Sequence, residues 1–366
     1  MTYRFTPVVE NLPSTVPFVG PEAQERQRGT KFRARIGANE SVFGPSPKAV
    51  HAMQQEAPQA WKYGDPENYD LKEALAAHHG VKPGNIVVGE GIDGLFGYTA
   101  RLFVAPGVPV ATSLGAYPTF NFQVATCGGE IVTVPYRDDR EDPEALLALA
   151  RKHDAALVYL SNPDNPMGSW WDAATVQHMI EKLPDRSLLC LDEAYSDFAP
   201  PGTLPEIDAA DPRVLRFRTF SKAHGLAGCR IGYAIGEAQL SRSFDRLRNH
   251  FGVNRIAQAG ALAALADSEH LRDVVQRVAR ARTRIAAIAQ DNELQALPSA
   301  TNFVAIDCAR DGDYARRVLE ELMARDVFVR MPGVAPQNRC IRVSAGTDSD
   351  LELFELALPA ALDAAR

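Results

Sequence analysis

Short apolar runs alternate with longer stretches of helical periodicity along most of this chain. Several runs, such as LVYL at residues 157–160 and LLCL at residues 188–191, are continuously apolar rather than alternating. Continuous apolar runs are typical of strands that helices cover on both faces. The strand candidates cover residues 85–89, 108–113, 130–136, 155–160, 187–192, 213–220 and 230–236. This alternation predicts an α/β domain with a mainly parallel seven-stranded sheet flanked by helices.

The C-terminal part of the chain has a different pattern. Residues 254–294 are rich in Ala, Arg, Leu and Gln with apolar positions at helical spacing, which predicts one or two long helices. Beyond them, strand candidates at residues 301–308 and 339–346 flank an amphipathic stretch at residues 314–325. We expect this part to form a second, smaller α+β domain.

The first 47 residues are rich in proline and indicate a coil-like arm. We expect residues 1–47 to form this arm and part of the small domain, residues 48–260 to form the large domain, and residues 261–366 to complete the small domain. The small domain would then be built from both ends of the chain.

Composition adds few restrictions, because 46% hydrophobic and 23% charged residues in a chain of 366 are ordinary for a globular protein. The net charge of −7 comes without a long run of either sign, which argues against a nucleic-acid tract or a polybasic membrane patch. Prolines and acids interrupt the N-terminus where a signal peptide needs a continuous apolar core, and no apolar run is long enough to span a bilayer. We therefore expect a cytoplasmic protein that acts on small soluble partners.

Cysteines and histidines give no case for a metal site. The eight histidines show neither H-x-x-x-H nor H-E-x-x-H spacing, and the five cysteines form no C-x-x-C pair. Scattered cysteines of this kind are typical of buried or idle thiols rather than of a disulfide framework. The cysteines are Cys127, Cys190, Cys229, Cys308 and Cys340.

Polar groups follow three consecutive strand candidates. The run ALVYL leads into SNPDNPMG with Asn165, LLCL leads into DEAY with Asp192, and VLRFRTF leads into SK with Lys222. Ligands of open α/β sheets bind outside the carboxyl ends of the strands, so we expect these three side chains to face one crevice. Taken singly, each has an ordinary explanation: a surface lysine, a helix-capping aspartate or a turn. Their conjunction in this order is the informative feature.

An amine, a carboxylate and an amide in one crevice suit pyridoxal phosphate. Lys222 can form a Schiff base with the aldehyde of this cofactor, and Asp192 facing the pyridine nitrogen would keep the ring protonated. Asn165 could donate to the phenolic oxygen of the ring. The candidates for holding the phosphate flank the lysine: Thr219, Ser221 and Arg230.

These motifs resemble those of a known family. SNPDNPMG, DEAYSDF and SKAHGLAGCRIGYAIG resemble the motifs of class I/II pyridoxal-phosphate aminotransferases of fold type I. IGANESVFGPSP, KYGDPENYDLKEALA, VFVR and RCIRVSAGT are similar to the histidinol-phosphate aminotransferase branch of that family. The resemblance runs from about residue 36 to residue 347 and implies a fold type I structure for most of the chain.

The resemblance also implies roles around the cofactor. In the segment GEGIDG, the backbone amides of three residues at a helix N-terminus would meet the phosphate. These residues are Gly91, Ile92 and Asp93. Tyr117 would stack on the pyridine ring, and Tyr195 would bond the phenolic oxygen together with Asn165. Tyr63 would reach the phosphate of a neighbouring subunit, which implies a homodimer with shared active sites.

For the substrate, Arg342 resembles the arginine that clamps a carboxylate or, in the histidinol-phosphate branch, a phosphate, and Arg330 would assist it. Asn39, Phe18 and Tyr3 either line the side-chain pocket or only pack the N-terminal arm.

The segment GEGIDG also matches G-x-G-x-x-G, the dinucleotide-binding pattern. A nicotinamide site needs an acidic residue about 20 positions further on, at the end of the next strand. That region reads VATSLGAYPTF and contains no acid, so the nicotinamide interpretation is disfavoured.

We therefore predict an aminotransferase that moves an amino group between histidinol phosphate, or a related L-amino acid, and a 2-oxo acid by a ping-pong mechanism. A decarboxylase of the threonine-phosphate decarboxylase type, or a non-catalytic protein that keeps the cofactor site, are the alternatives. Two departures bear on the substrate: Met167 stands where the family commonly has threonine, and GTDSDLELF lacks a glutamate that is usual in the branch. His224 stands where the branch commonly has an aromatic or hydrophobic residue and would either contact substrate or be a buried structural histidine.

Overall fold

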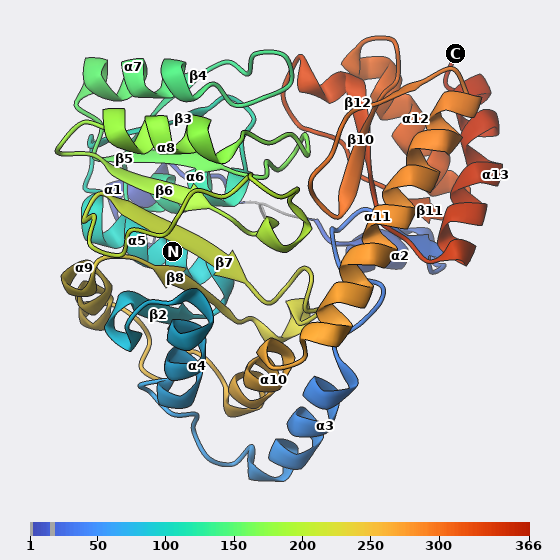
Figure 1. The fold of residues 1–366 in the computed structure, drawn as a ribbon. Helices are drawn as coiled ribbons and strands as arrows, with labels where there is room; N and C mark the ends of the chain where they lie inside the picture. Colours follow the sequence, from blue (N-terminus) through green and yellow to red (C-terminus); the bar gives the residue numbers. More distant parts are fainter. Residues whose placement is uncertain (1–2, 15–18) are drawn as a thin grey trace.

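A seven-stranded sheet forms the centre of the larger of two structural units in the computed structural model, which describes residues 3–14 and 19–366 (Figure 1). The strand order is β2-β8-β7-β6-β5-β3-β4, and every pair is parallel except those that involve β8. The strands are β2 (Ile86–Gly89), β3 (Pro109–Ser113), β4 (Glu130–Val134), β5 (Leu157–Ser161), β6 (Leu188–Asp192), β7 (Val214–Thr219) and β8 (Gly232–Ile235). The predicted mainly parallel sheet is confirmed, with each strand ending within two residues of its apolar run.

Helices cover both faces of this sheet, and β5 shows why its sequence is continuously apolar. Tyr159 packs in a cluster with Phe96 of α5 (Gly91–Phe103), on one face of the sheet. Val158, one position earlier, packs with Leu146 of α7 (Pro143–His153) on the opposite face. Successive strand residues point to opposite faces, so a strand covered on both sides must be apolar at every position.

The helices of the large unit begin and end at local signals. Asp142 caps α7 by accepting from the backbone nitrogen of Ala145, and Asp154 closes the helix in the left-handed conformation with φ 49°. Asn254 caps α10 in the same way. The helices of this unit are α3 (Pro47–Glu56), α4 (Tyr69–His79), α5 (Gly91–Phe103), α6 (Pro118–Thr126), α7 (Pro143–His153), α8 (Ala173–Lys182), α9 (Ala238–Ser243) and α10 (Arg255–Leu265).

The smaller unit combines both ends of the chain. Its antiparallel sheet has the order β12-β10-β9, and a short parallel pair joins β1 to β11. The pairing of β1 with β11 brings the N-terminal segment into this unit. Ile36, the residue after β1, is buried in the same core as Phe303, Ile341 and Phe354. The elements are β1 (Ala34–Arg35), β9 (Gln295–Ala296), β10 (Phe303–Asp307), β11 (Val327–Phe328), β12 (Cys340–Ser344), α11 (Ser268–Asp291), α12 (Gly312–Ala324) and α13 (Asp348–Ala364).

The N-terminal arm is more ordered than a coil. It contains α1 (Pro7–Glu10) and α2 (Pro21–Arg28), which the sequence analysis did not predict. The segment PEAQERQR of α2 has no apolar stripe, so periodicity could not reveal it. Ion pairs hold it instead: Arg28 meets Asp326 at 2.5 Å.

The chain passes from α10 to α11 close to the boundary that the sequence analysis expects. Residue 260, where the sequence analysis divides the chain, falls inside α10, and Ala261 and Ala264 pack with Leu75 of α4 in the large unit. The long helix α11 then runs from the large unit to the small one (Figure 1).

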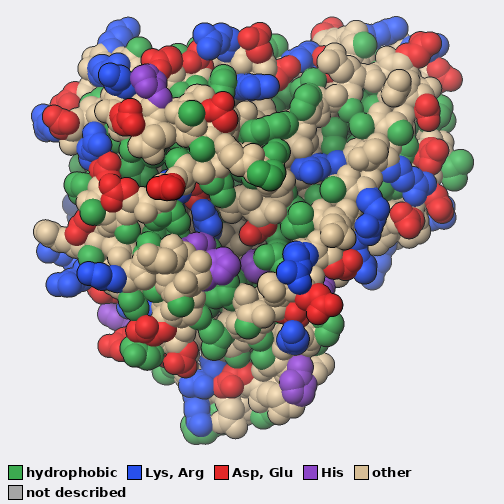
Figure 2. Space-filling view, in the orientation of Figure 1, with side chains coloured by type: hydrophobic (Ala, Val, Ile, Leu, Met, Phe, Trp, Pro, Cys, Tyr) green, Lys and Arg blue, Asp and Glu red, His purple; other side chains and the backbone are tan. Residues whose placement is uncertain are grey.

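Charged side chains of both signs are interspersed over the face shown in Figure 2. Among the helices that the structure describes, none is long and apolar enough to cross a membrane. Within the same residues, no group of three or more His, Cys, Asp and Glu side chains is arranged to hold a metal ion.

Candidate active site

The carboxyl ends of β5, β6 and β7 bring the three predicted groups to one edge of the sheet. Ser161 pairs with Asp192 across β5 and β6, and Asp192 pairs with Phe217 across β6 and β7. Asn165 lies four residues beyond the end of β5, and Lys222 lies three residues beyond the end of β7. The topology therefore places the amide, the carboxylate and the amine side by side.

Lys222 is held by two contacts. Its Nζ donates to the backbone oxygen of Asn39 at 3.2 Å and lies 5.6 Å from the centre of the Tyr195 ring. Burial, helped by the positive charge of Arg342, lowers the pKa of Lys222 to about 8. A usable fraction of the amine is therefore unprotonated, and hence nucleophilic, near neutral pH.

Asp192 is buried and hydrogen-bonded. The hydroxyl of Tyr159 donates to Oδ2 at 2.7 Å, and the backbone nitrogen of Ala194 donates to Oδ1 at 3.0 Å. Burial raises the pKa of Asp192 to about 6, while these donors oppose the rise. A buried carboxyl group of this kind gains most from a cationic N–H partner, such as a protonated pyridine ring.

The first turn of α5 provides an anion-binding end. Gly91 opens the helix with φ 77°, and a Cβ at this position would lie 2.6 Å from Nη2 of Arg230. Glycine suits this φ, and a side chain here would have to displace the guanidinium group that lies beside the start of α5. The carboxylate of Asp93 accepts from the hydroxyl of Tyr117 at 3.0 Å and lies 3.6 Å from Arg230.

Two hydroxyl groups flank this end. Thr219 donates from Oγ1 to Oγ of Ser221 at 2.9 Å, and the Ser221 backbone nitrogen donates to Thr219 Oγ1 at 3.0 Å. Thr219 pairs with Gly232 of β8. Gly232 in turn lies against the start of α5, since a Cβ added to Gly232 would be 3.1 Å from the backbone nitrogen of Ile92. The hydroxyls, the helix start and the guanidinium thus lie together, as a phosphate site requires.

The remaining predicted ring contacts converge from other elements. Tyr195 is 2% exposed, and its hydroxyl accepts from Nδ2 of Asn39 at 2.9 Å. Burial raises the pKa of both Tyr195 and Tyr117. Asn165 accepts from Nη1 of Arg342 at 2.5 Å, which fixes its amide oxygen.

The two predicted substrate arginines are neighbours in the smaller unit. Their backbones pair in antiparallel fashion, with Arg330 N donating to Arg342 O at 3.1 Å. The Arg330 side chain donates from Nη2 to the backbone oxygen of Val19 at 2.5 Å. Burial, together with the charge of Arg342, lowers the pKa of Arg330 to about 10. Within the described chain, Nε of Arg342 is buried without a hydrogen-bond partner. This N–H group can therefore donate to a bound anion.

Two predicted residues lie on the surface of the single chain. Tyr63 is 73% exposed and stacks on Phe251, with the two ring centres 4.4 Å apart. Tyr3 is also exposed and contacts Phe5 of the same arm, and whether it lines the substrate pocket stays a prediction. Phe18 lies outside the described residues.

Met167 and His224, which depart from the family pattern, are both buried in this chain. Met167 is 1% exposed and packs with Tyr136 of the large unit and with Ala305 and Cys340 of the small one. Its side chain therefore supports the contact between the units. His224 is buried with its ring 4.9 Å from that of Phe220, and burial lowers its pKa.

Sequence reasoning missed the groups that support the predicted ones. The hydroxyl of Tyr159 donates to Asp192. A tyrosine hydroxyl inside the apolar run LVYL could have indicated this buried hydrogen bond. Ser344 and Asn302, which bond Asn39, had no comparable signal because they come from the distant small unit.

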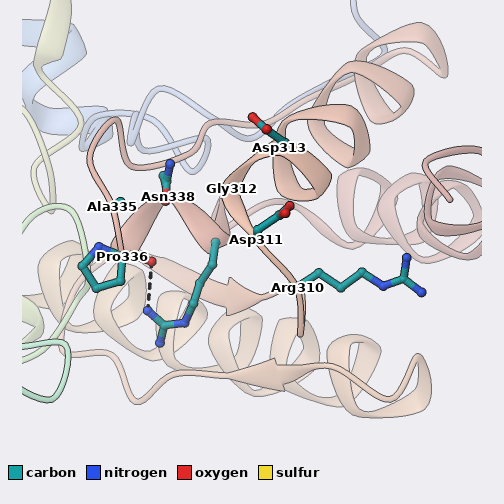
Figure 3. A pocket seen from close by; sticks show the side chains of 8 residues that line it. Arg310, Asp311, Gly312, Asp313, Ala335, Pro336 and Asn338 are labelled. Atoms are coloured by element: carbon teal, nitrogen blue, oxygen red, sulfur yellow. Dashed lines mark hydrogen bonds between the residues drawn. The ribbon is translucent and has the colours of Figure 1, made fainter.

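Two cavities differ in their relation to this site. One cavity, of about 390 Å³, lies on the small unit between the start of α12 and the turn at Pro336, and none of the predicted site residues lines it. Figure 3 shows the residues that line this cavity. A cavity of about 530 Å³ is lined by Asp93 together with Glu90, Tyr98 and Asn249, so it opens beside the phosphate end of the site.

The donor set fits pyridoxal phosphate. Lys222 supplies an amine for the aldehyde, Asp192 a carboxylate for the ring nitrogen, and the α5 start with Arg230 an anion site for the phosphate. The close approach of Arg230 to Gly91, which a side chain at position 91 would disturb, is the structural feature that favours a bound phosphate there.

Comparisons with known proteins agree with this chemistry. The family model described as "Aminotransferase class I and II" matches residues 35–355. Histidinol-phosphate aminotransferase of Moorella thermoacetica is 33% identical over 347 residues, which are 94% of this chain and 89% of that protein. Histidinol-phosphate aminotransferase 2 of Ralstonia nicotianae is 34% identical over 370 residues, which are 99% of this chain and 98% of that protein.

A solved structure is closer still. The histidinol-phosphate aminotransferase from Sinorhizobium meliloti, solved in complex with pyridoxal-5'-phosphate, is 55% identical and superimposes with a TM-score of 0.96 over 99% of this chain and 98% of that one. The match covers both units and the edge of the sheet that carries Lys222. This chain therefore belongs to the class I and II aminotransferases, pyridoxal-phosphate-dependent enzymes of fold type I.

Proposed function

We propose that this enzyme transfers the amino group of histidinol phosphate to a 2-oxo acid, as a step of histidine biosynthesis. The observation that carries the proposal is Arg342, which bonds Asn165 and whose charge acts on Lys222, with Arg330 as its backbone neighbour. The relatives that bear the name histidinol-phosphate aminotransferase, including the 55% identical one, support it.

In this proposal, each residue around the cofactor has a distinct role. Bound pyridoxal phosphate supplies an electron sink for the pair released when the substrate's C–H bond breaks, and it carries the amino group between the two half-reactions. Lys222 holds the cofactor and, once freed by the substrate, acts as the base that takes the proton from the substrate carbon. Asp192 keeps the ring nitrogen protonated. Asn165 and Tyr195 orient the phenolic oxygen.

Arg342 and Arg330 are proposed to bind the phosphate of the substrate. A phosphate dianion can accept from several N–H groups at once, and the unpartnered Nε of Arg342 offers such a donor. A related L-amino acid would place its carboxylate there instead. Asn39 is close to both Lys222 and Tyr195 and is proposed to border the substrate.

We also propose that the enzyme is a cytoplasmic homodimer with shared active sites. Tyr63 and Phe251 form an exposed aromatic pair, and Trp61 nearby in the sequence is 78% exposed. Large exposed aromatic groups are enriched where subunits meet. In such a dimer Tyr63 would reach the phosphate site of the neighbouring subunit.

An absorbance titration of the purified protein tests the substrate. Histidinol phosphate is expected to convert the bound cofactor to pyridoxamine phosphate, and Arg342→Ala is expected to raise the KM for this substrate at least tenfold. Conversion only by carboxylated amino acids would overturn histidinol phosphate as the substrate. Release of carbon dioxide from a phosphorylated amino acid would indicate the decarboxylase alternative.

A further inference from the structure

Asn39 is the meeting point of the three parts of the chain that build the site. It belongs to the N-terminal segment, is 3% exposed, and has φ 55° in the left-handed region, which asparagine tolerates better than most residues. Its backbone oxygen accepts two hydrogen bonds, from Nζ of Lys222 at 3.2 Å and from Nδ2 of Asn302 at 3.1 Å. One donor is the proposed base, and the other belongs to the small unit.

The other polar groups of Asn39 are also bonded. Its backbone nitrogen donates to Oγ of Ser344 at 3.1 Å, and the same hydroxyl donates to Oδ1 of Asn39 at 3.1 Å. Its Nδ2 donates to the hydroxyl of Tyr195 at 2.9 Å. Ser344 and Asn302 are 2% and 1% exposed, so these bonds are shielded from water.

Resting on the proposed role of Lys222, we propose that Asn302 and Ser344 are positioning residues that act on the lysine amine through the backbone of Asn39. A freed amine must aim its lone pair at the substrate carbon, and one N–H donated to a fixed carbonyl oxygen restricts its orientation. Ser344 fixes the peptide of Asn39 in place. Asn302 shares the carbonyl oxygen with the lysine.

The shared oxygen has a second consequence. The N–H dipole of Asn302 reduces the negative potential that the oxygen offers to an ammonium group, which disfavours the protonated lysine. The charged groups that face Lys222 act in both directions: Arg342 and Arg230 lower its pKa, and Asp93 and Glu40 raise it. Those groups are unchanged when Asn302 is replaced.

The test uses full-length protein freed of cofactor, and it measures the rate of recombination with pyridoxal phosphate against pH. This rate follows the unprotonated fraction of Lys222, and the midpoint for the natural chain is expected near pH 8. Asn302→Ala is expected to raise the midpoint by about 0.5 to 1 pH unit, since the lysine becomes the carbonyl's single donor. Asn302→Asp keeps the size of the side chain and adds a negative charge, so this variant is expected to raise the pH midpoint further.

Thr301→Val is the matched control. Thr301 is the adjacent residue and is fully buried. Its hydroxyl donates to the backbone oxygen of Phe303, accepts from the backbone nitrogen of Phe303 and bonds the hydroxyl of Ser299, so the variant loses buried hydrogen bonds without removing a bond of Asn39. Its midpoint is expected to equal that of the natural chain. An Asn302→Ala midpoint that coincides with the Thr301→Val midpoint would overturn the proposed role of Asn302.

Ser344→Ala supplies an independent measurement if Asn302→Ala fails to fold. The variant frees the backbone of Asn39, so the recombination rate on the high-pH plateau is expected to fall severalfold below that of Thr301→Val. Equal plateaus would contradict the positioning role. A Lys222→Ala variant that still attaches the cofactor covalently would instead show that the proposed function of Lys222 is wrong.

Discussion

Burial acts on the two central ionisable groups of the site in opposite directions. It lowers the pKa of Lys222 to about 8 and raises the pKa of Asp192 to about 6, because in each case it disfavours the charged form. Both values lie close to neutral pH, where an amine must lose a proton and a carboxyl must be ready to pair with a cationic ring. The same physical cause thus prepares an acid and a base for complementary tasks.

At the residue scale, replacement of Tyr159 by Phe is expected to change the pH profile of kcat/KM. The Tyr159 hydroxyl lowers the pKa of Asp192, so its removal raises that pKa. Activity that needs the carboxylate is then lost at a higher pH as the solution is acidified, by about 0.5 pH unit or more. Tyr314→Phe, which removes a buried hydroxyl bonded to Leu362 in the small unit, is the control. An acid limb that coincides for the two variants would contradict the role of Tyr159.

The predictability of the site also differs from residue to residue. Asn165, Asp192 and Lys222 could be placed together because each follows an apolar run that had to be a strand. Asn302 could not be placed, because its contact with Asn39 spans 263 positions and no local pattern encodes such a pairing. The conformations of exposed Tyr63 and Tyr3 likewise depend on what packs against them, not on their neighbours in the sequence.

At the scale of elements, the strands of four or more residues were predictable to within two residues because apolar runs mark the part of a chain that a sheet buries. The helix α2 was missed because Glu and Arg ion pairs, rather than an apolar stripe, hold it to the small unit. The short pair of β1 with β11 has two residues in each strand, too few to leave a pattern. We propose that the boundary between the units falls in the turn between α10 and α11.

The start of α5 gives a prediction at this scale. Gly91→Ala is expected to weaken the affinity for pyridoxal phosphate at least about tenfold, since φ 77° strains alanine and the new Cβ would displace Arg230. Fluorescence titration of the cofactor-free protein measures this affinity. Gly202→Ala is the matched control, because its φ of 82° gives similar backbone strain with nothing within 4 Å of the new Cβ. Equal affinities in the two variants would mean that the close approach to Arg230 does not matter.

At the scale of the whole molecule, the two units are joined where the chemistry takes place. Met167 packs between them, and the backbone oxygen of Gly168 accepts from Ala300 of the small unit at 2.8 Å. Arg342 of the small unit bonds Asn165 of the large one. The site therefore depends on the relative placement of two separately formed cores.

Subunit complementation tests the proposed shared sites. Lys222→Ala and Tyr63→Ala chains, each of low activity alone, are mixed after unfolding and refolding. Each heterodimer then holds one site with an intact Lys222 from one chain and an intact Tyr63 from the other. Random mixing is expected to restore about a quarter of the natural activity. Activity no higher than the mean of the two parents would mean that Tyr63 serves the site of its own chain or none.

The sequence by itself determined the class of fold and the set of chemical groups. Apolar runs and cap residues act through the local backbone, so they can be read one segment at a time. The tertiary structure alone decided how these groups are tuned. Burial of Lys222 and Asp192, the close approach at Gly91, and the bonds of Asn39 to residues 263 and 305 positions away arise only when distant segments meet. Electrostatic and hydrogen-bond energies depend on distances in space, and those distances exist only in the folded chain.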